Sequence, residues 1–177
     1  MTTVPALRHR CVVRMVHSLT SSTDDWDDQL ESFETGWPGF IEALRVYLRH
    51  YPGRPAAAVH AVVHQPGDQA DMWRTLSTAL NLAGGNVGER RETSPGSPRL
   101  AGVIERVHQD GRSREVMLRL DEPTEGVAVV GTCQPGGQAS GIVSLFFYGA
   151  DAAQTAAGER SKWNAWLADL LRAPATP

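Results

Sequence analysis

The stretch GIVSLFFY, from Gly141 to Tyr148, decides the fold, because it is almost wholly apolar and leads into a long helical pattern over residues 151–172. A short apolar run of β-branched and aromatic residues is typical of a strand in the middle of a sheet. In the helical pattern, apolar residues recur every three or four positions and include Trp163 and Trp166. We therefore predict a central strand followed by an amphipathic C-terminal helix that covers the sheet.

The segment before this strand is typical of antiparallel hairpins. Residues 103–109 and 114–120 flank Asp110 and Gly111, a dipeptide that favours tight turns. A third strand is predicted over residues 126–133, before a Pro-Gly-Gly turn. Strands joined by such short connections usually pair with each other, so we predict an antiparallel sheet.

An earlier strand and a short helix complete this unit. Residues 57–64 alternate in the manner of a strand, and apolar residues at helical spacing follow from Met72 to Leu80. Gly84 and Gly85 end that helix. Residues 86–99 are rich in Gly, Pro, Ser and charges, and we predict a loop there.

The first part of the chain repeats the pattern of a strand followed by a tryptophan-bearing helix. Residues 7–15 alternate as a strand, and a helix is predicted from about Ser21, with a kink or a division into two parts at Gly36 and Pro38. Its apolar stripe comprises Trp26, Leu30, Phe33, Trp37, Ile41, Leu44 and Leu48. So much apolar surface must pack against something, and residues 51–55 then form a linker.

The bulk composition excludes several classes of protein. The 177 residues are 41% hydrophobic and 21% charged, which is enough apolar material for a sizeable core. The formal net charge is −3 and the arginines are scattered among acids, so we expect no nucleic-acid partner. We find neither an apolar run long enough for a membrane span nor a signal-peptide pattern. Cys11 and Cys133 are then expected to be free thiols in the cytoplasm.

Three pieces of sequence carry a resemblance to a known family. They are residues 12–18 (VVRMVHS), residues 25–27 (DWD), and residues 36–40 (GWPGF) with Leu44, Tyr47 and Leu48. They resemble the closing strand and last helix of START-like (SRPBCC) proteins, and most of all the group related to activators of the 90-kDa heat-shock protein ATPase. The resemblance implies an α+β helix-grip fold, in which a curved antiparallel sheet packs on a long C-terminal helix.

The resemblance also implies a division of the chain. Residues 1–54 correspond to the final strand and helix of a truncated START-like unit, and residues 55–177 to an abbreviated second unit. The strands that precede such a helix in the family are missing here. Either the true start lies upstream of Met1, or the leftover strand and helix pack on the second unit or on another chain.

Family members hold apolar ligands between sheet and last helix, so the resemblance implies a cavity in this place. The residues that we expect on its wall are Met117, Phe146, Tyr148, Trp163 and Trp166. Pockets of this kind are mostly apolar and aromatic. Packing in the core is the alternative role for the tryptophans.

No catalytic set or metal site can be recognised. His60 and His64 share one face of a predicted strand, without the acidic residue of a zinc-protease motif. The acids near residue 25 fit a helix N-terminus better than a calcium loop. We therefore expect no metal or other cofactor, and no catalytic residue.

The leading hypothesis is a non-catalytic binding protein for a hydrophobic small molecule or a protein partner, with a homodimer among the arrangements considered. One alternative is a co-chaperone-like regulator of a heat-shock ATPase. Another is a small cyclase or hydrolase that uses His60, His64 or Tyr148 in the sheet–helix cavity.

Overall fold

The computed structural model describes residues 27–111, 113–134 and 137–172, with side chains from residue 38 onward. These residues form a six-stranded antiparallel sheet with the strand order β1-β6-β5-β4-β3-β2. The strands are β1 (Ala56–Gln65), β2 (Arg90–Glu92), β3 (Ala101–Gln109), β4 (Ser113–Glu122), β5 (Gly126–Cys133) and β6 (Ala139–Tyr148). The apolar stretch that opened the sequence analysis is β6, which lies between β1 and β5 as predicted.

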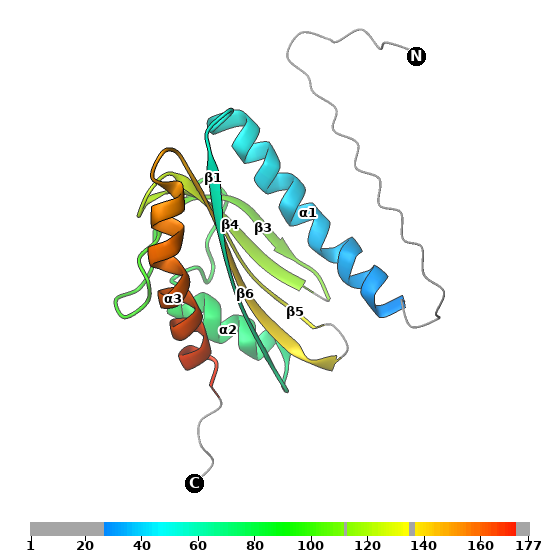
Figure 1. The fold of residues 1–177 in the computed structure, drawn as a ribbon. Helices are drawn as coiled ribbons and strands as arrows, with labels where there is room; N and C mark the ends of the chain where they lie inside the picture. The colour runs from blue at the N-terminus through cyan, green and yellow to red at the C-terminus, as the bar shows by residue number, and fades with distance from the viewer. Residues whose placement is uncertain (1–26, 112, 135–136, 173–177) are drawn as a thin grey trace, which may run out of the picture.

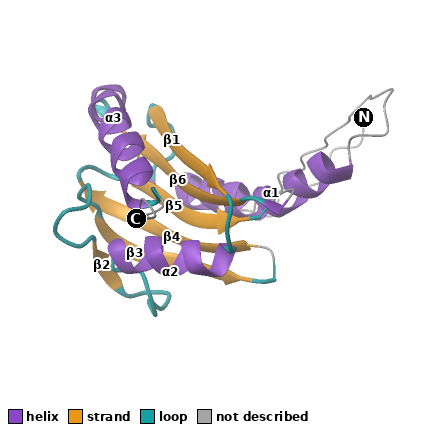
Figure 2. Ribbon diagram, turned by 90° about the horizontal axis from the view of Figure 1, so that it is seen from below, coloured by secondary structure: helices purple, strands orange, loops and turns teal. Residues whose placement is uncertain are grey.

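Three helices cover the two faces of this sheet. Helices α2 (Gln69–Ala79) and α3 (Ala152–Leu170) pack on one face, which we call the inner face. Helix α1 (Asp27–His50) packs on the opposite, outer face. Figure 1 shows α1 and α3 on opposite sides of the strands, and Figure 2 shows the curvature of the sheet. The predicted α+β helix-grip architecture is confirmed.

The inner face holds the larger hydrophobic core. Alternate residues of the strands point into it, as the period of a strand requires. Helix α3 lies mainly over β1 and contributes Trp163 and Leu167, which are fully buried. Helix α2 contributes Met72 and Leu76. The amphipathic C-terminal helix therefore covers the sheet as its spacing predicts.

Helix α1 packs on the sheet with an unexpected side. Ala43 and Val46 are buried against the outer face, whereas Ile41 and Leu48 of the predicted stripe are 53% and 47% exposed. The stripe was predicted to pack against something, and within the described part of the chain these two positions are not covered. The small side chains of Ala43 and Val46 allow the helix to approach the strands closely. The close packing that results compensates for leaving the larger Ile41 and Leu48 side chains exposed.

The course of the chain around α1 also departs from the prediction. Pro38 lies inside a single helix, so one missing backbone hydrogen bond does not divide it. Tyr51, predicted to be in a linker, is buried beneath the helix end. Within the described residues, α1 packs on the outer face of the sheet, against side chains of β4, β5 and β6. The strand predicted over residues 7–15 and the start of the helix at Ser21 lie outside the described residues.

The predicted loop over residues 86–99 contains the short strand β2. It pairs with β3 at one edge of the sheet, through Arg90, Arg91 and Glu92. The run is short, charged and surrounded by Gly and Pro, so its composition indicates a loop. Charges on a short edge strand also discourage pairing with other chains.

Candidate functional site

The structure divides the five predicted cavity residues between the two faces of the sheet. Met117, Phe146 and Tyr148 lie in the outer cluster beneath α1. Trp163 and Trp166 lie in the inner cluster, with ring centroids 5.5 Å apart. The reason is the period of the strand, because even-numbered residues of β6 point outward and odd-numbered ones inward. The five residues therefore cannot line one common cavity, and a role in ligand binding stays a prediction for each.

The outer cluster is an aromatic contact between α1 and β6. The ring of Tyr148 stacks on Tyr51 at 4.7 Å between centroids and lies 5.1 Å from that of Tyr47. Burial, helped by the two neighbouring phenols, raises the pKa of Tyr148 to about 12. The Tyr148 hydroxyl thus stays protonated at neutral pH, and the Tyr148 ring packs against the two tyrosines at the C-terminal end of α1.

The inner cluster contains an unsatisfied polar atom. Trp163 is fully buried, and its indole Nε1 has no hydrogen-bond partner within the described part of the chain. Trp73, Trp166 and Leu170 are half-buried around the same cluster. A buried donor without an acceptor is uncommon and costly, so each such atom needs an explanation.

Packing on the inner face is tight where α2 and α3 meet. A Cβ on Gly141 would lie 2.7 Å from Leu171 Cδ1 and 3.3 Å from the sulfur of Met72. Gln69, at the start of α2, is buried and donates to the carbonyl and hydroxyl of Thr132 at 3.0 and 3.2 Å. These contacts fix α2 on β5 and leave no room beside Gly141.

The two histidines lie on the exposed outer side of β1. His60 Nδ1 is 3.1 Å from the Ser144 hydroxyl, and His64 Nδ1 is 2.8 Å from that of Ser140. Four residues separate the histidines, which is roughly 13 Å along a strand. Tyr148 pairs with Ala56, a further four residues from His60. No two of the three side chains His60, His64 and Tyr148 are therefore within hydrogen-bond reach of each other.

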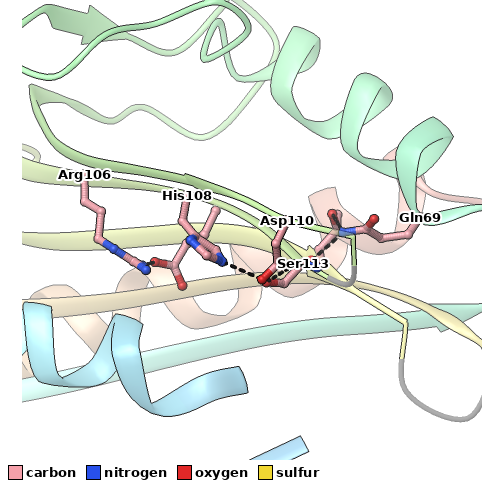
Figure 3. Close-up of polar contacts among 7 residues, drawn as sticks. Gln69, Arg106, His108, Asp110 and Ser113 are labelled. Carbon is pink, nitrogen blue, oxygen red and sulfur yellow. Dashed lines mark hydrogen bonds and ion pairs between the residues drawn. The ribbon is translucent and has the colours of Figure 1, made fainter. Parts of the chain in front are cut away.

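A charged network, which sequence analysis did not identify, occupies the outer face at the β3–β4 hairpin. Arg106 forms an ion pair with Glu115, and His108 Nε2 is 2.9 Å from Asp110. Asp110 also accepts from the Ser113 backbone amide at 2.7 Å. Figure 3 shows Arg106, His108, Asp110 and Ser113 in sequence along this hairpin. The network anchors the turn and includes Glu115, whose side chain is 20% exposed.

Glu115 lies directly beneath α1. A Cβ on Gly39 would be 2.5 Å from Glu115 Oε2, so a larger residue there would displace the Glu115 carboxylate. Burial raises the pKa of Glu115, against the opposing charges of Arg106 and His108. Burial raises this pKa, whereas the ion pair with Arg106 lowers it. We take burial as dominant, because the helix removes water from the carboxylate.

This environment predicts how pH affects stability. The folded chain favours neutral Glu115, so its contribution to folding is fully present below its ordinary pKa of 4.5 and is lost as pH rises through the raised folded value. We therefore compare the free energy of unfolding of the wild type with that of Glu115→Gln at each pH. This difference should favour the wild type more at pH 4 than at pH 7. Urea unfolding across this range measures the difference. The control is Glu125→Gln, at a side chain 54% exposed. A difference that favours the wild type more at pH 7 would contradict the prediction.

The remaining candidates from the sequence carry no site. Cys133 is a free thiol, as predicted, and burial raises its pKa, opposed by a hydrogen bond with Ser140. Cys11 lies outside the described residues. In the described ranges, no three His, Cys, Asp or Glu side chains are grouped to hold a metal ion. The helices of the same ranges are all too short or too polar to cross a membrane.

These features define the class of the protein. It is an α+β helix-grip fold, with a curved antiparallel sheet packed on a long C-terminal helix. No protein-family model matches the sequence, and a search of curated proteins finds no match. The fold is similar to hypothetical protein jhp0584 from Helicobacter pylori, with TM-score 0.50 and 13% identity over 70% of this chain and 91% of that one.

Two further solved structures have lower similarity. DynU16, a protein of the dynemicin biosynthetic locus, has a TM-score of 0.43 and 17% identity over 66% of this chain and 48% of that one. Protein MLL2253 from Mesorhizobium loti has a TM-score of 0.44 and 14% identity over 63% of this chain and 96% of that one. At such identities, structural likeness bears on the fold alone.

Proposed function

We propose that this protein is a non-catalytic START-like binding module, which holds a small apolar molecule between α3 and the inner face of the sheet. The observation that carries the proposal is the buried Trp163 Nε1, which has no acceptor within the described residues. A ligand with one acceptor oxygen would satisfy this donor, and its apolar part would replace contacts of the surrounding side chains.

The position of the ligand follows from the packing. The space beside Gly141 is filled by Leu171 and Met72, so no ligand fits there. Trp166 and Leu170 are half-buried on α3, next to Trp163. The ligand would enter beside these side chains and displace part of the contact between α3 and β1. The histidines lie on the other face and would not touch it.

Fluorescence titration of the full chain tests the proposal with two probes. Dodecanoic acid offers an acceptor oxygen, whereas naphthalene offers none. The variant Trp163→Phe keeps an aromatic ring but removes the N–H donor. We expect it to bind dodecanoic acid about 2- to 10-fold more weakly, the value of one hydrogen bond, with naphthalene binding unchanged.

The matched control is Trp166→Phe, which should change the affinity for both probes by the same factor, because Trp166 contacts the apolar part of either probe and Trp163 keeps its donor. If the wild type binds neither dodecanoic acid nor naphthalene, the proposal is wrong. If the wild type and Trp163→Phe bind dodecanoic acid with equal affinity, the Trp163 indole does not donate a hydrogen bond to the ligand.

A second candidate is a co-chaperone-like regulator of a heat-shock ATPase. It is favoured by the resemblance of residues 12–48 to that group and by the exposure of Ile41 and Leu48 on α1. The purified chain would then change the ATPase rate of a 90-kDa heat-shock protein, and Ile41→Glu would abolish the change. An unchanged rate at saturating chain concentration would contradict this candidate.

A further inference from the structure

The inner face of β4 carries an arginine without an acidic partner. Arg114 lies on the same side of this strand as the buried Val116, because alternate residues of a strand share a face. Arg106 and Arg119 of the same hairpin each form an ion pair with a glutamate. Arg114 forms no ion pair with the described residues, and its Nε is buried without a hydrogen-bond partner. A half-buried guanidinium is normally paired, so this one needs an explanation.

Only part of the Arg114 guanidinium is closed to solvent. The side chain is half-buried, and Nε is its one nitrogen that is both buried and without a partner in the described part of the chain. The two Nη atoms therefore face solvent. A carboxylate can bind both Nη atoms as they stand. It can also turn the guanidinium and bind Nε together with one Nη, which gives the unsatisfied donor an acceptor.

The start of α2 fixes the surroundings of Arg114. Thr132 of β5 is its direct cross-strand partner, so the two Cβ atoms are about 5 Å apart. The buried Gln69 amide donates to the carbonyl and hydroxyl of Thr132 at 3.0 and 3.2 Å. Figure 3 shows Gln69 at the same end of the sheet as Ser113, which precedes Arg114 in the hairpin. Arg114 thus lies beside a well-defined contact between helix and sheet.

The acids at the start of α2 already have partners. Asp68 accepts from the backbone amides of Ala70 and Asp71 at 2.7 and 3.2 Å. The Asp71 carboxylate forms an ion pair with Arg74 on the exposed side of the helix. Neither carboxylate neutralises Arg114, so the positive charge of its guanidinium is available to a ligand.

Apolar side chains lie close to this charge. Val107 of β3 pairs with Val116, two residues from Arg114, and is 45% exposed. Side chains on such a diagonal are about 7–8 Å apart. Trp73 lies one helical turn after Gln69 and is half-buried on that side of α2. A single guanidinium with apolar neighbours is suited to an apolar carboxylate, because a phosphate carries a second charge that one guanidinium does not balance.

We propose that Arg114 binds the carboxylate of an apolar ligand, at the β3–β4 hairpin beside the start of α2. Thr132, the neighbour of Arg114, pairs on its other side with Gly141. Met72 and Leu171 fill the space beside Gly141 and so separate this site from the one proposed between α3 and the sheet. The site therefore goes beyond the proposed function and does not depend on it.

Isothermal titration calorimetry of the full chain with 2-naphthoate and its neutral amide, 2-naphthamide, tests the site. Arg114→Gln should bind 2-naphthoate about 10- to 100-fold more weakly than the wild type, the usual range for hydrogen bonds to a charged group. Its affinity for 2-naphthamide should not change. The matched control is Arg74→Gln, which removes the same charge from a side chain that is 74% exposed, and it should bind 2-naphthoate as the wild type does. Circular dichroism with a thermal scan shows that each variant is folded.

Nuclear magnetic resonance of the wild type follows the binding atom directly. The Arg114 Nε–Hε cross-peak, assigned by its loss in Arg114→Gln, should shift with 2-naphthoate and not with 2-naphthamide. A wild type that does not bind 2-naphthoate, an unshifted cross-peak, or equal affinity of the wild type and Arg114→Gln would each overturn the proposal. Weaker binding of 2-naphthoate in Trp163→Phe alone would place the probe between α3 and the sheet, which would overturn this site and leave the proposed function intact.

Discussion

Replacing Trp163 by alanine is expected to lower the free energy of unfolding by about 3–5 kcal/mol, the usual cost of removing a large buried aromatic ring. Trp163 is fully buried between α3 and the sheet, in contact with the half-buried Trp166. Its removal opens a cavity in the inner cluster and loosens the helix that covers β1. Urea unfolding followed by far-UV circular dichroism measures the change.

Two further variants show whether this loss comes from burial. Trp166→Ala should cost less than half as much, because that ring is partly in water. Trp163→Phe should change stability by about 1 kcal/mol or less, since lost ring volume and the removal of an unpaired donor act in opposite directions. Equal losses for Trp163→Ala and Trp166→Ala would contradict the position assigned to Trp163.

Gly102→Ala is expected to destabilise the fold by about 2–3 kcal/mol, at the upper end of overpacking effects. A Cβ at this position would lie 2.2 Å from the Arg119 carbonyl oxygen and 2.9 Å from Leu120 Cα. These are backbone atoms of the paired strand β4, so no side chain can move aside. The register shift between Ala101 and Gly102 brings the two strands into this contact.

Gly158→Ala is the control for this substitution. Gly158 lies on the exposed side of α3, and a Cβ there meets no atom within 4 Å. Alanine is the better helix former, so this variant should gain about 0.5–1 kcal/mol. The same chemical change should thus have opposite effects in a crowded strand and an open helix. Chemical denaturation of both variants measures them, and a neutral Gly102→Ala would show that β3 and β4 can separate without cost.

Local periodicity was sufficient for most of the architecture. The apolar run of β6, the turn at Asp110 and Gly111, and the spacing of Trp163 and Leu167 each reflect a single dominant preference of the chain. Because these preferences agree with one another, the antiparallel sheet and its C-terminal helix could be predicted.

The side of α1 that faces the sheet could not be predicted, since both of its sides carry apolar residues. Hydrophobicity favours Ile41 and Leu48 as the buried side, but close approach at Gly39, Ala43 and Val46 decides the packing. The division of the predicted cavity wall has a related cause. Met117 and Trp163 are both apolar and buried, and only the sheet between them shows that they belong to different clusters.

The charged network was missed because of an irregularity in β3. A register shift between Ile104 and Arg106 interrupts the alternation of the strand. Glu105 and Arg106 then both pair with residues of the outer face, namely Arg119 and Glu115. Strict alternation from Ile104 would place Arg106 in the inner core, so the signal in the sequence was misleading.

The alternation of faces along the strands limits where the chain can change in length. An insertion of one residue within β4 would exchange Met117 and Leu118 between the α1 side and the α3 side, and would carry the charge of Arg119 into the apolar interior. Both helices would lose their contacts together. Variation in length should therefore be confined to connections such as residues 93–99, where an added residue shifts no pairing.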